Sequence, residues 1–129
     1  MAALPDIRLL PPPTTAPDCR VCHKPGTRLI TRASNRTGNA NRPYYKCVPC
    51  KKFLRFDDNR GNDASNPLCY CQTSSKMQVA GPHKSVPRGL HYVCLSGACD
   101  YYEVRLDEKE RQVALDEKLV ATLAGLKLI

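Results

Sequence analysis

The chain has 129 residues, with 7 glycines, 11 prolines and 8 cysteines, a length that allows one ordinary domain or two very small ones. Its glycine and proline content is near the average of globular proteins, which excludes a collagen-like or low-complexity chain. The longest apolar runs fall far short of the ~20 residues that span a bilayer. The N-terminus lacks both a basic segment and a sustained apolar segment. We therefore expect no membrane span, no secretory signal and an intracellular location.

Positive charge is concentrated in one part of the chain. Lysine and arginine outnumber aspartate and glutamate 20 to 12, and residues 19–58 alone carry ten bases against two acids. No acidic residue lies between Asp18 and Asp57. Such a block is typical of a surface that binds a polyanion, although a basic face that only maintains solubility would have the same charge.

The chain begins with a proline-rich segment. Residues 1–18 hold five prolines, three of them consecutive at Pro11, Pro12 and Pro13. Consecutive prolines favour the extended polyproline conformation. We therefore predict an extended tail over residues 1–18.

The cysteines form four close pairs that repeat along the chain: Cys19, Cys22, Cys47, Cys50, then Cys69, Cys71, Cys94, Cys99. Corresponding cysteines are offset by 47 to 50 positions, which makes the chain an imperfect tandem repeat. Two close thiol pairs separated by about 20 residues are the pattern of a tetrahedral zinc site. A unit of about 40 residues also needs the metal, because it cannot bury enough apolar surface to fold alone. We predict two zinc ions per chain, each held by four thiolates.

Two other roles compete for these cysteines. Four disulfides could stabilise such a chain, but an intracellular compartment keeps thiols reduced. The run from Cys19 to His23 also matches the C-x-x-C-H pattern of c-type haem attachment, but haem would leave Cys47 and Cys50 without a role. His23 remains an alternative zinc ligand in place of a neighbouring cysteine.

The zinc pattern predicts a small, metal-stabilised, mostly β fold with two three-stranded antiparallel zinc ribbons. Ribbon 1 covers residues 19–58, with strands at 27–32, 42–46 and 52–56. A linker at 59–68 leads to ribbon 2, residues 69–106, with strands at 76–80, 90–93 and 101–105. These strands are assigned from β-branched and aromatic runs that are bounded by turn residues.

The composition changes after residue 106 to residues that favour helices, with acids in the first turn. We predict an amphipathic C-terminal α-helix over 107–129, with an apolar stripe at Leu115, Leu119, Thr122, Leu126 and Ile129. The stripe is shorter than a coiled coil requires. It either packs against the ribbons or forms a homodimer, and the second is the slightly favoured interpretation.

Ribbon 1 also carries a more specific pattern of a glycine turn, an arginine, an aromatic pair before the third cysteine, and two closing aromatics: Gly38-Asn39-Ala40-Asn41-Arg42-Pro43-Tyr44-Tyr45-Lys46-Cys47, Cys50, Phe53 and Phe56. This pattern resembles the GRF-type zinc finger, a zinc ribbon of DNA-repair nucleases, glycosylases and topoisomerases. Ribbon 2 matches at its C-x-C start and its closing aromatic spacing, which makes the chain resemble a divergent tandem pair. The closing aromatics of ribbon 1 come about one position late, and neither ribbon has the closing tryptophan of the family.

The resemblance implies a claw-like sheet that holds single-stranded nucleic acid, DNA ahead of RNA, and a nuclear location. The composition of ribbon 1 agrees, because cations follow phosphates and aromatic faces stack on unpaired bases. We expect eight contact residues there: Arg28, Arg36, Arg42, Tyr44, Lys46, Lys51, Lys52 and Arg55. Strand alternation places Tyr44 and Tyr45 on opposite faces, so one of them is expected in the core. Phe53 or Phe56 is also expected there.

These observations favour a non-enzymatic module that binds single-stranded nucleic acid mainly through ribbon 1. A protein–protein adaptor with structural ribbons and a dimerising helix is the alternative. An enzyme is disfavoured, because four cysteine ligands leave zinc no open position for water. No phosphate loop or catalytic triad is present in the sequence.

Overall fold

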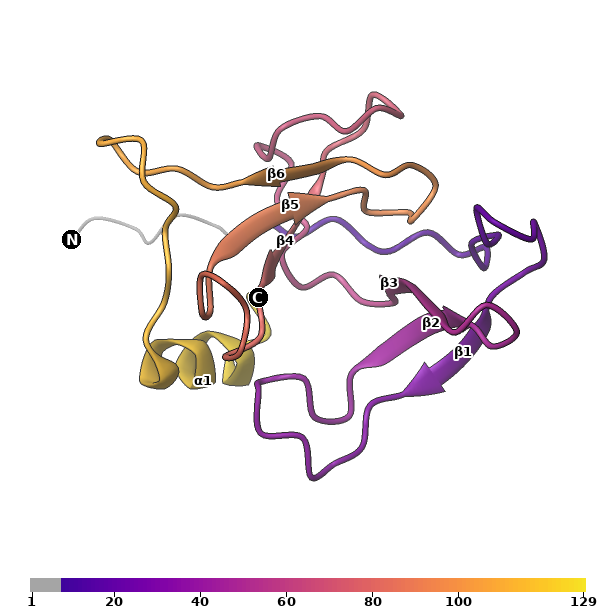
Figure 1. Ribbon diagram of the computed structural model, residues 1–129, viewed down its shortest axis with the longest axis horizontal. Coiled ribbons are helices and arrows are strands. Elements are labelled where there is room, and N and C mark those ends of the chain that lie inside the picture. The colour runs from indigo at the N-terminus through magenta and orange to yellow at the C-terminus, as the bar shows by residue number, and fades with distance from the viewer. Residues whose placement is uncertain (1–7) are drawn as a thin grey trace.

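The computed structural model describes residues 8–129, and these residues form two small sheets and one helix (Figure 1). Strands β1 (Thr27–Ile30), β2 (Pro43–Cys47) and β3 (Lys52–Phe56) form the sheet of ribbon 1, in the order β1-β2-β3. Strands β4 (Lys76–Val79), β5 (Leu90–Val93) and β6 (Tyr102–Val104) form the sheet of ribbon 2, in the order β4-β5-β6. All neighbouring strands are antiparallel. The predicted fold class is confirmed, and the strands over 52–56 and 90–93 have the predicted bounds.

The pairing of β2 with β3 contains an irregularity that shapes one face of ribbon 1. Tyr44 lies opposite Phe56 and Lys46 lies opposite Phe53, so three steps along β3 match two steps along β2. The extra residue, Leu54, forms a β-bulge. Because of this bulge, Phe53 and Phe56 lie on the same face as Tyr44, although a spacing of three would place them on opposite faces of a regular strand.

The apolar core is small. Among the described residues, the buried apolar side chains are Cys19, Cys47, Cys69, Leu90, Cys94, Val120 and Ile129. Four of these seven are cysteines, so most of the buried apolar surface lies at the predicted zinc sites. The rest of the interior is polar, with Arg42, Arg55, Arg60 and Lys76 all buried.

Asp58, just after β3, joins the two ribbons through buried ion pairs. Its carboxylate accepts hydrogen bonds from Arg42 of ribbon 1, with an Nε–Oδ2 distance of 2.6 Å, and from Lys76 Nζ of β4 at 2.8 Å. The side chains of Arg42 and Lys76 are only 4% and 1% exposed. Burial acts to raise the pKa of Asp58, but the hydrogen bond from Arg42 and the charge of Lys76 outweigh it, and the pKa lies below its usual value. Burial lowers the pKa of Lys76 to about 8.

The segment between the ribbons is part of the same buried network. Arg60 donates to the carbonyl oxygens of Gly38 at 2.8 Å and of Ile129 at 2.7 Å. Gly61 has a φ of +76°, and a Cβ there would clash with the Met77 carbonyl oxygen of β4. The predicted linker is therefore a packed connection that fixes the two ribbons against each other.

The described part of the proline-rich segment packs along ribbon 1 and the predicted linker. Leu10 and the buried Asn62 exchange hydrogen bonds, from Leu10 N to Asn62 O at 2.8 Å and from Asn62 Nδ2 to Leu10 O at 2.9 Å. Arg55 of β3 donates to the carbonyl oxygens of Pro13 and Thr15 at 3.2 and 3.1 Å. Residues 1–7 of the predicted tail lie outside the described residues.

The C-terminal helix is shorter than predicted. Helix α1 covers Glu117–Gly125, and Asp116 caps it by accepting a hydrogen bond from Leu119 N at 2.7 Å. The prediction of helix from residue 107 was wrong, because the segment before Asp116 pairs with ribbon 2: Leu90 N donates to Val113 O at 2.8 Å. Strand-like hydrogen bonds in the folded protein thus override the local helix preference.

The predicted apolar stripe divides between the inside and the surface. Ile129 of the stripe is buried. Val120, which lies beside the stripe, is also buried and packs over Gly38, where a Cβ would lie 3.3 Å from the valine. Leu119 and Leu126 are 42% and 62% exposed. Internal packing therefore accounts for part of the stripe, and self-association through the rest stays a prediction. Within residues 8–129 no helix is long and apolar enough to cross a membrane.

Replacement of Asp58 tests whether the buried ion pairs hold the ribbons together. We expect Asp58→Asn to lower the free energy of unfolding by about 3–5 kcal/mol, because Arg42 and Lys76 stay buried without their counter-charge. Chemical denaturation of the zinc-loaded protein measures this loss. Glu108→Gln, at an exposed carboxylate, is the matched control and should change stability by less than about 0.5 kcal/mol. Equal stability of the two variants would contradict a joining role for Asp58.

Candidate metal centres and nucleic-acid interface

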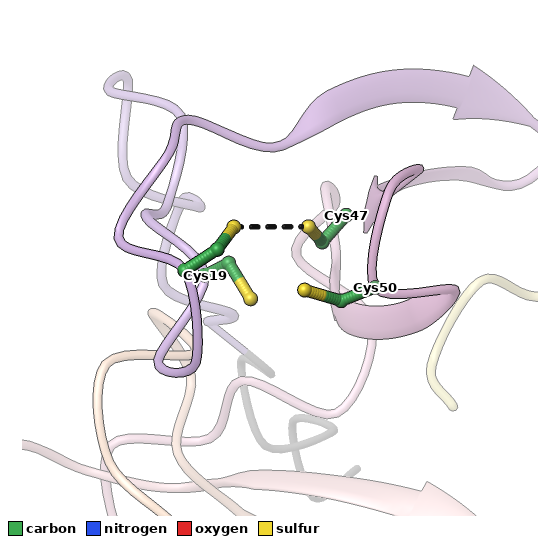
Figure 2. A group of neighbouring side chains, drawn as sticks. Cys19, Cys47 and Cys50 are labelled. Carbon is green, nitrogen blue, oxygen red and sulfur yellow. Dashed lines mark hydrogen bonds between the residues drawn. The ribbon is translucent and has the colours of Figure 1, made fainter.

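Four cysteines of ribbon 1 converge on one point. Cys19 and Cys22 lie in the turn before β1, Cys47 is the last residue of β2, and Cys50 lies in the turn that leads to β3. Their sulfur atoms all lie within 4.8 Å of one another, and Figure 2 shows the side chains of Cys19, Cys47 and Cys50 pointing toward one another. The loop and the hairpin thus present two thiols each, as the sequence pattern predicted.

Ribbon 2 contains a second cluster of the same kind. Cys69 and Cys71 lie before β4, Cys94 and Cys99 lie between β5 and β6, and their sulfur atoms also lie within 4.8 Å of one another. The structure therefore brings all eight predicted ligands into two groups of four. His23, the alternative ligand, is exposed and is not a member of either group.

Tight turns with left-handed residues position the thiols. The residue directly after Cys22, Cys50 and Cys71 has a positive φ: +61° at His23, +54° at Lys51 and +64° at Gln72. The fourth turn, between Cys94 and Cys99, has its positive φ of +74° at Gly97. The amide nitrogens of Val21 and Cys71 lie 3.4 Å from the sulfur atoms of Cys19 and Cys69. Amide donors that point at sulfur stabilise its negative charge.

The thiols of each cluster differ in acidity. Hydrogen bonds from the Cys22 and Val21 amides lower the pKa of Cys19 to about 6. Burial acts to raise the pKa of Cys94, but hydrogen bonds from Ser96 and nearby amides outweigh it and lower the pKa to about 6. Hydrogen bonds with neighbouring thiols raise the pKa of Cys50 and of Cys71 to about 12. Zinc must displace the protons that remain, so its affinity rises with pH.

The donor set fits structural zinc. Four thiolates in a compact group are typical of tetrahedral Zn²⁺ sites, and both groups are compatible with one zinc ion each. All four ligand positions of each ion would be taken by the protein. Such a site stabilises the fold and offers no position for a reacting water molecule.

The eight residues expected to contact nucleic acid fall into three classes. Tyr44, Lys46 and Lys51 line one groove on the face of the ribbon 1 sheet. Arg28, Arg36 and Lys52 are exposed elsewhere, with Arg28 paired to Asp57 at 2.9 Å. Arg42 and Arg55 are buried.

The burial of Arg42 and Arg55 corrects the expectation that they contact phosphate. The Arg42 guanidinium lies 3.6 Å from the centre of the Phe56 ring and pairs with Asp58. The Arg55 guanidinium lies 4.8 Å from the centre of the Tyr45 ring and pairs with Asp57 at 3.2 Å. Both arginines are therefore packing and pairing groups inside the fold.

The groove on ribbon 1, here named the ring groove, has a volume of about 680 Å³. Its lining contains three aromatic rings and three cations: Tyr44, Phe53, Phe56, Arg32, Lys46 and Lys51. The Tyr44 and Phe53 rings stack with centres 5.8 Å apart, and the Phe53 and Phe56 rings meet edge to face at 4.9 Å. Tyr45 is the tyrosine that faces the opposite side.

Sequence reasoning missed Phe53, Phe56 and Arg32 as groove residues. One of Phe53 and Phe56 was expected in the core, but the β-bulge at Leu54 turns both rings to the groove. In this sequence the two closing aromatics come about one position later than in the family pattern, and that shift was the sequence signal of the extra residue. Arg32 lines the groove from the segment after β1, and so does Asn35. The carboxamide oxygen of Asn35 stabilises this loop by accepting a hydrogen bond from Thr37 N at 2.9 Å.

Metal analysis of the folded protein tests the two clusters. We expect two zinc ions per chain, and only one in Cys47→Ser or in Cys71→Ser, because each serine removes one thiolate of a four-ligand site. A chelator should unfold the protein, since zinc binding supplies folding free energy. Native mass spectrometry and circular dichroism measure both effects. A wild-type chain that folds with one zinc ion or none would contradict the assignment.

Comparison with known proteins finds a match over ribbon 1. Residues 16–60 match a family model described as GRF-like zinc ribbon domain. The match includes all four cysteines of ribbon 1 and the three strands of its sheet, and it ends before ribbon 2. No curated protein and no solved structure matches the chain significantly. The cysteine cluster and the three-stranded sheet agree with this match, and residues 16–60 of the chain are thus similar to a GRF-like zinc ribbon domain in both sequence and structure.

Proposed function

We propose that this chain is a non-catalytic zinc-ribbon module that binds single-stranded nucleic acid in the ring groove. The observation that carries the proposal is the combination of stacked, accessible rings with cations at one open groove: Tyr44, Phe53 and Phe56 beside Arg32, Lys46 and Lys51. Proteins that bind single strands combine a positive groove for the phosphates with aromatic rings for the bases.

The charge distribution of ribbon 1 supports the proposal. The two acids of residues 19–58 are Asp57 and Asp58. Asp57 pairs with Arg28 and Arg55, and Asp58 pairs with Arg42 and Lys76. Neither carboxylate lines the ring groove, whose charged lining is entirely basic. A phosphate backbone therefore meets attraction along the groove without a nearby carboxylate to repel it.

The exposed ring of Phe53 favours the binding of unpaired bases. Phe53 is exposed at the surface of β3, where a base could stack on its ring. Bases in a duplex stack on one another and offer no free face, whereas every unpaired base has one. We therefore infer a preference for single strands over duplexes, with DNA as the expected partner.

A second candidate function is a protein–protein adaptor that self-associates through α1. The exposure of Leu119 and Leu126 on the helix favours it. Two leucines make only a small apolar surface, and scattered exposed leucines are common on monomers. The adaptor therefore ranks below nucleic-acid binding.

Replacement of Phe53 tests stacking in the ring groove. We expect Phe53→Ala to weaken binding of a single-stranded oligothymidylate about five- to hundredfold, the effect of losing one stacked base. Phe53→Tyr keeps the ring and should bind within about twofold of the wild type. The salt dependence should be the same in both variants, because a stacked base releases no counterion. Fluorescence anisotropy measures the affinities, and unchanged binding by Phe53→Ala would refute stacking there.

The neighbouring lysines 51 and 52 offer a matched test of the phosphate path. Both are exposed, but only Lys51 lines the ring groove. We expect Lys51→Ala to reduce the slope of log K against log salt by about 0.7, as the loss of one single-strand phosphate contact does. Lys52→Ala should leave the slope unchanged. An unchanged slope in Lys51→Ala, with two zinc ions bound, would place the phosphates outside the groove.

A further inference from the structure

We propose that a strand bound in the ring groove continues across Phe53 into a second groove between the two ribbons, where Tyr102 of β6 stacks on a further base. This inference rests on the proposed function and extends it to ribbon 2. The second groove, here named the inter-ribbon groove, has a volume of about 250 Å³, and its lining includes Arg20, Phe53, Gln78, Asp100 and Tyr102.

Phe53 connects the two grooves. Phe53 lines both the ring groove and the inter-ribbon groove. Phe53 and Tyr102 are both exposed, by 48% and 61%. A strand that stacks on Phe53 therefore lies at the entrance of the groove that leads to Tyr102.

Ribbon 2 repeats the ring arrangement of ribbon 1. Tyr44 of β2 stacks on Phe53 of β3 with ring centres 5.8 Å apart and planes inclined by 27°. In ribbon 2, His91 of β5 stacks on Tyr102 of β6 at 5.1 Å and 29°. Phe53 and Tyr102 occupy the same place in the register, opposite the residue before the cysteine, Lys46 in one sheet and Val93 in the other. The internal repeat thus provides a second ring pair with the geometry of the first.

The two grooves keep a fixed relation because the ribbons are packed together. Gly97, in the second zinc turn of ribbon 2, lies against β3: a Cβ there would be 2.9 Å from the Leu54 carbonyl oxygen. Gly97 also has a φ of +74°, which favours glycine. The close contact places the turn that precedes β6 directly beside the strand that carries Phe53.

The charges of the inter-ribbon groove determine what kind of contact to expect. Its exposed charged groups are Arg20 and Asp100, which have opposite signs, and Arg55 in its wall is paired with Asp57. The groove thus adds little net charge for phosphates, in contrast to the ring groove. Base stacking on Tyr102 should therefore contribute more to affinity than any new phosphate contact.

A length series of oligothymidylates tests the path. With zinc-loaded protein and oligomers from about 4 to about 16 nucleotides, we expect Tyr102→Ala to bind the shortest oligomers as the wild type does. The same variant should bind the longest ones about five- to hundredfold more weakly. If Tyr102→Ala holds fewer than two zinc ions, Tyr102→Leu takes its place in the test, because leucine keeps an apolar side chain but has no ring. Tyr102→Leu should then show the same loss of affinity for the longest oligomers.

Tyr70→Ala is the matched control. Tyr70 is an exposed tyrosine of ribbon 2 whose ring packs on Tyr101, and it does not line the inter-ribbon groove. Its variant should bind all lengths as the wild type does. Wild-type affinity for the longest oligomers in Tyr102→Ala and Tyr102→Leu, or an equal loss at every length, would overturn the inference while the ring groove stands. Failure of the wild type to bind any oligomer would instead overturn the proposed function, and the extension with it.

Discussion

Convergence of eight thiols on two points is the constraint on which the rest of this structure depends. Each cluster joins a turn before the first strand of a ribbon to the turn between its second and third strands. Within residues 8–129, four of the seven buried apolar residues are cysteines of these clusters, so little other apolar surface there is available to hold the sheets. Metal–thiolate bonds supply the folding free energy that so small a core cannot, and the Asp58 ion pairs and the packed linker then fix one ribbon against the other.

Because the metal sites and the ion pairs stabilise the fold, aromatic rings remain available for binding. In a small domain without metal, the rings of Tyr44, Phe53 and Phe56 would be needed in the core. Here the guanidinium of the buried Arg42 packs on the Phe56 ring, 3.6 Å from the ring centre, while the groove stays open. Aromatic rings that are already positioned lose little conformational freedom on binding, which favours affinity. The same buried arginine thus links fold stability to the shape of the proposed binding surface.

Local patterns predicted the fold well, and long-range contacts account for what they missed. Cysteine spacing predicted the two clusters, and β-branched and aromatic runs bounded by turn residues predicted the strands over 52–56 and 90–93 with their observed bounds. The burial of Arg42 and Arg55 depends on Asp58, Asp57 and the proline-rich segment, contacts that no short window of sequence contains. The helix began at Glu117 and not at residue 107 because residues before it pair with ribbon 2, and the outward turn of Phe53 followed from a bulge.

The central claim is that the metal-held sheet of ribbon 1 presents one face, the ring groove, to a single strand. Chemical-shift mapping by NMR on the zinc-loaded chain, titrated with a single-stranded oligothymidylate, tests it most directly. The account predicts that amide shifts concentrate at β2, β3 and the segment after β1, around Arg32, Tyr44, Lys51 and Phe53, whereas the amides of α1 stay in place. Shifts confined to α1, or to the Tyr45 side of the sheet without the ring groove, would contradict it.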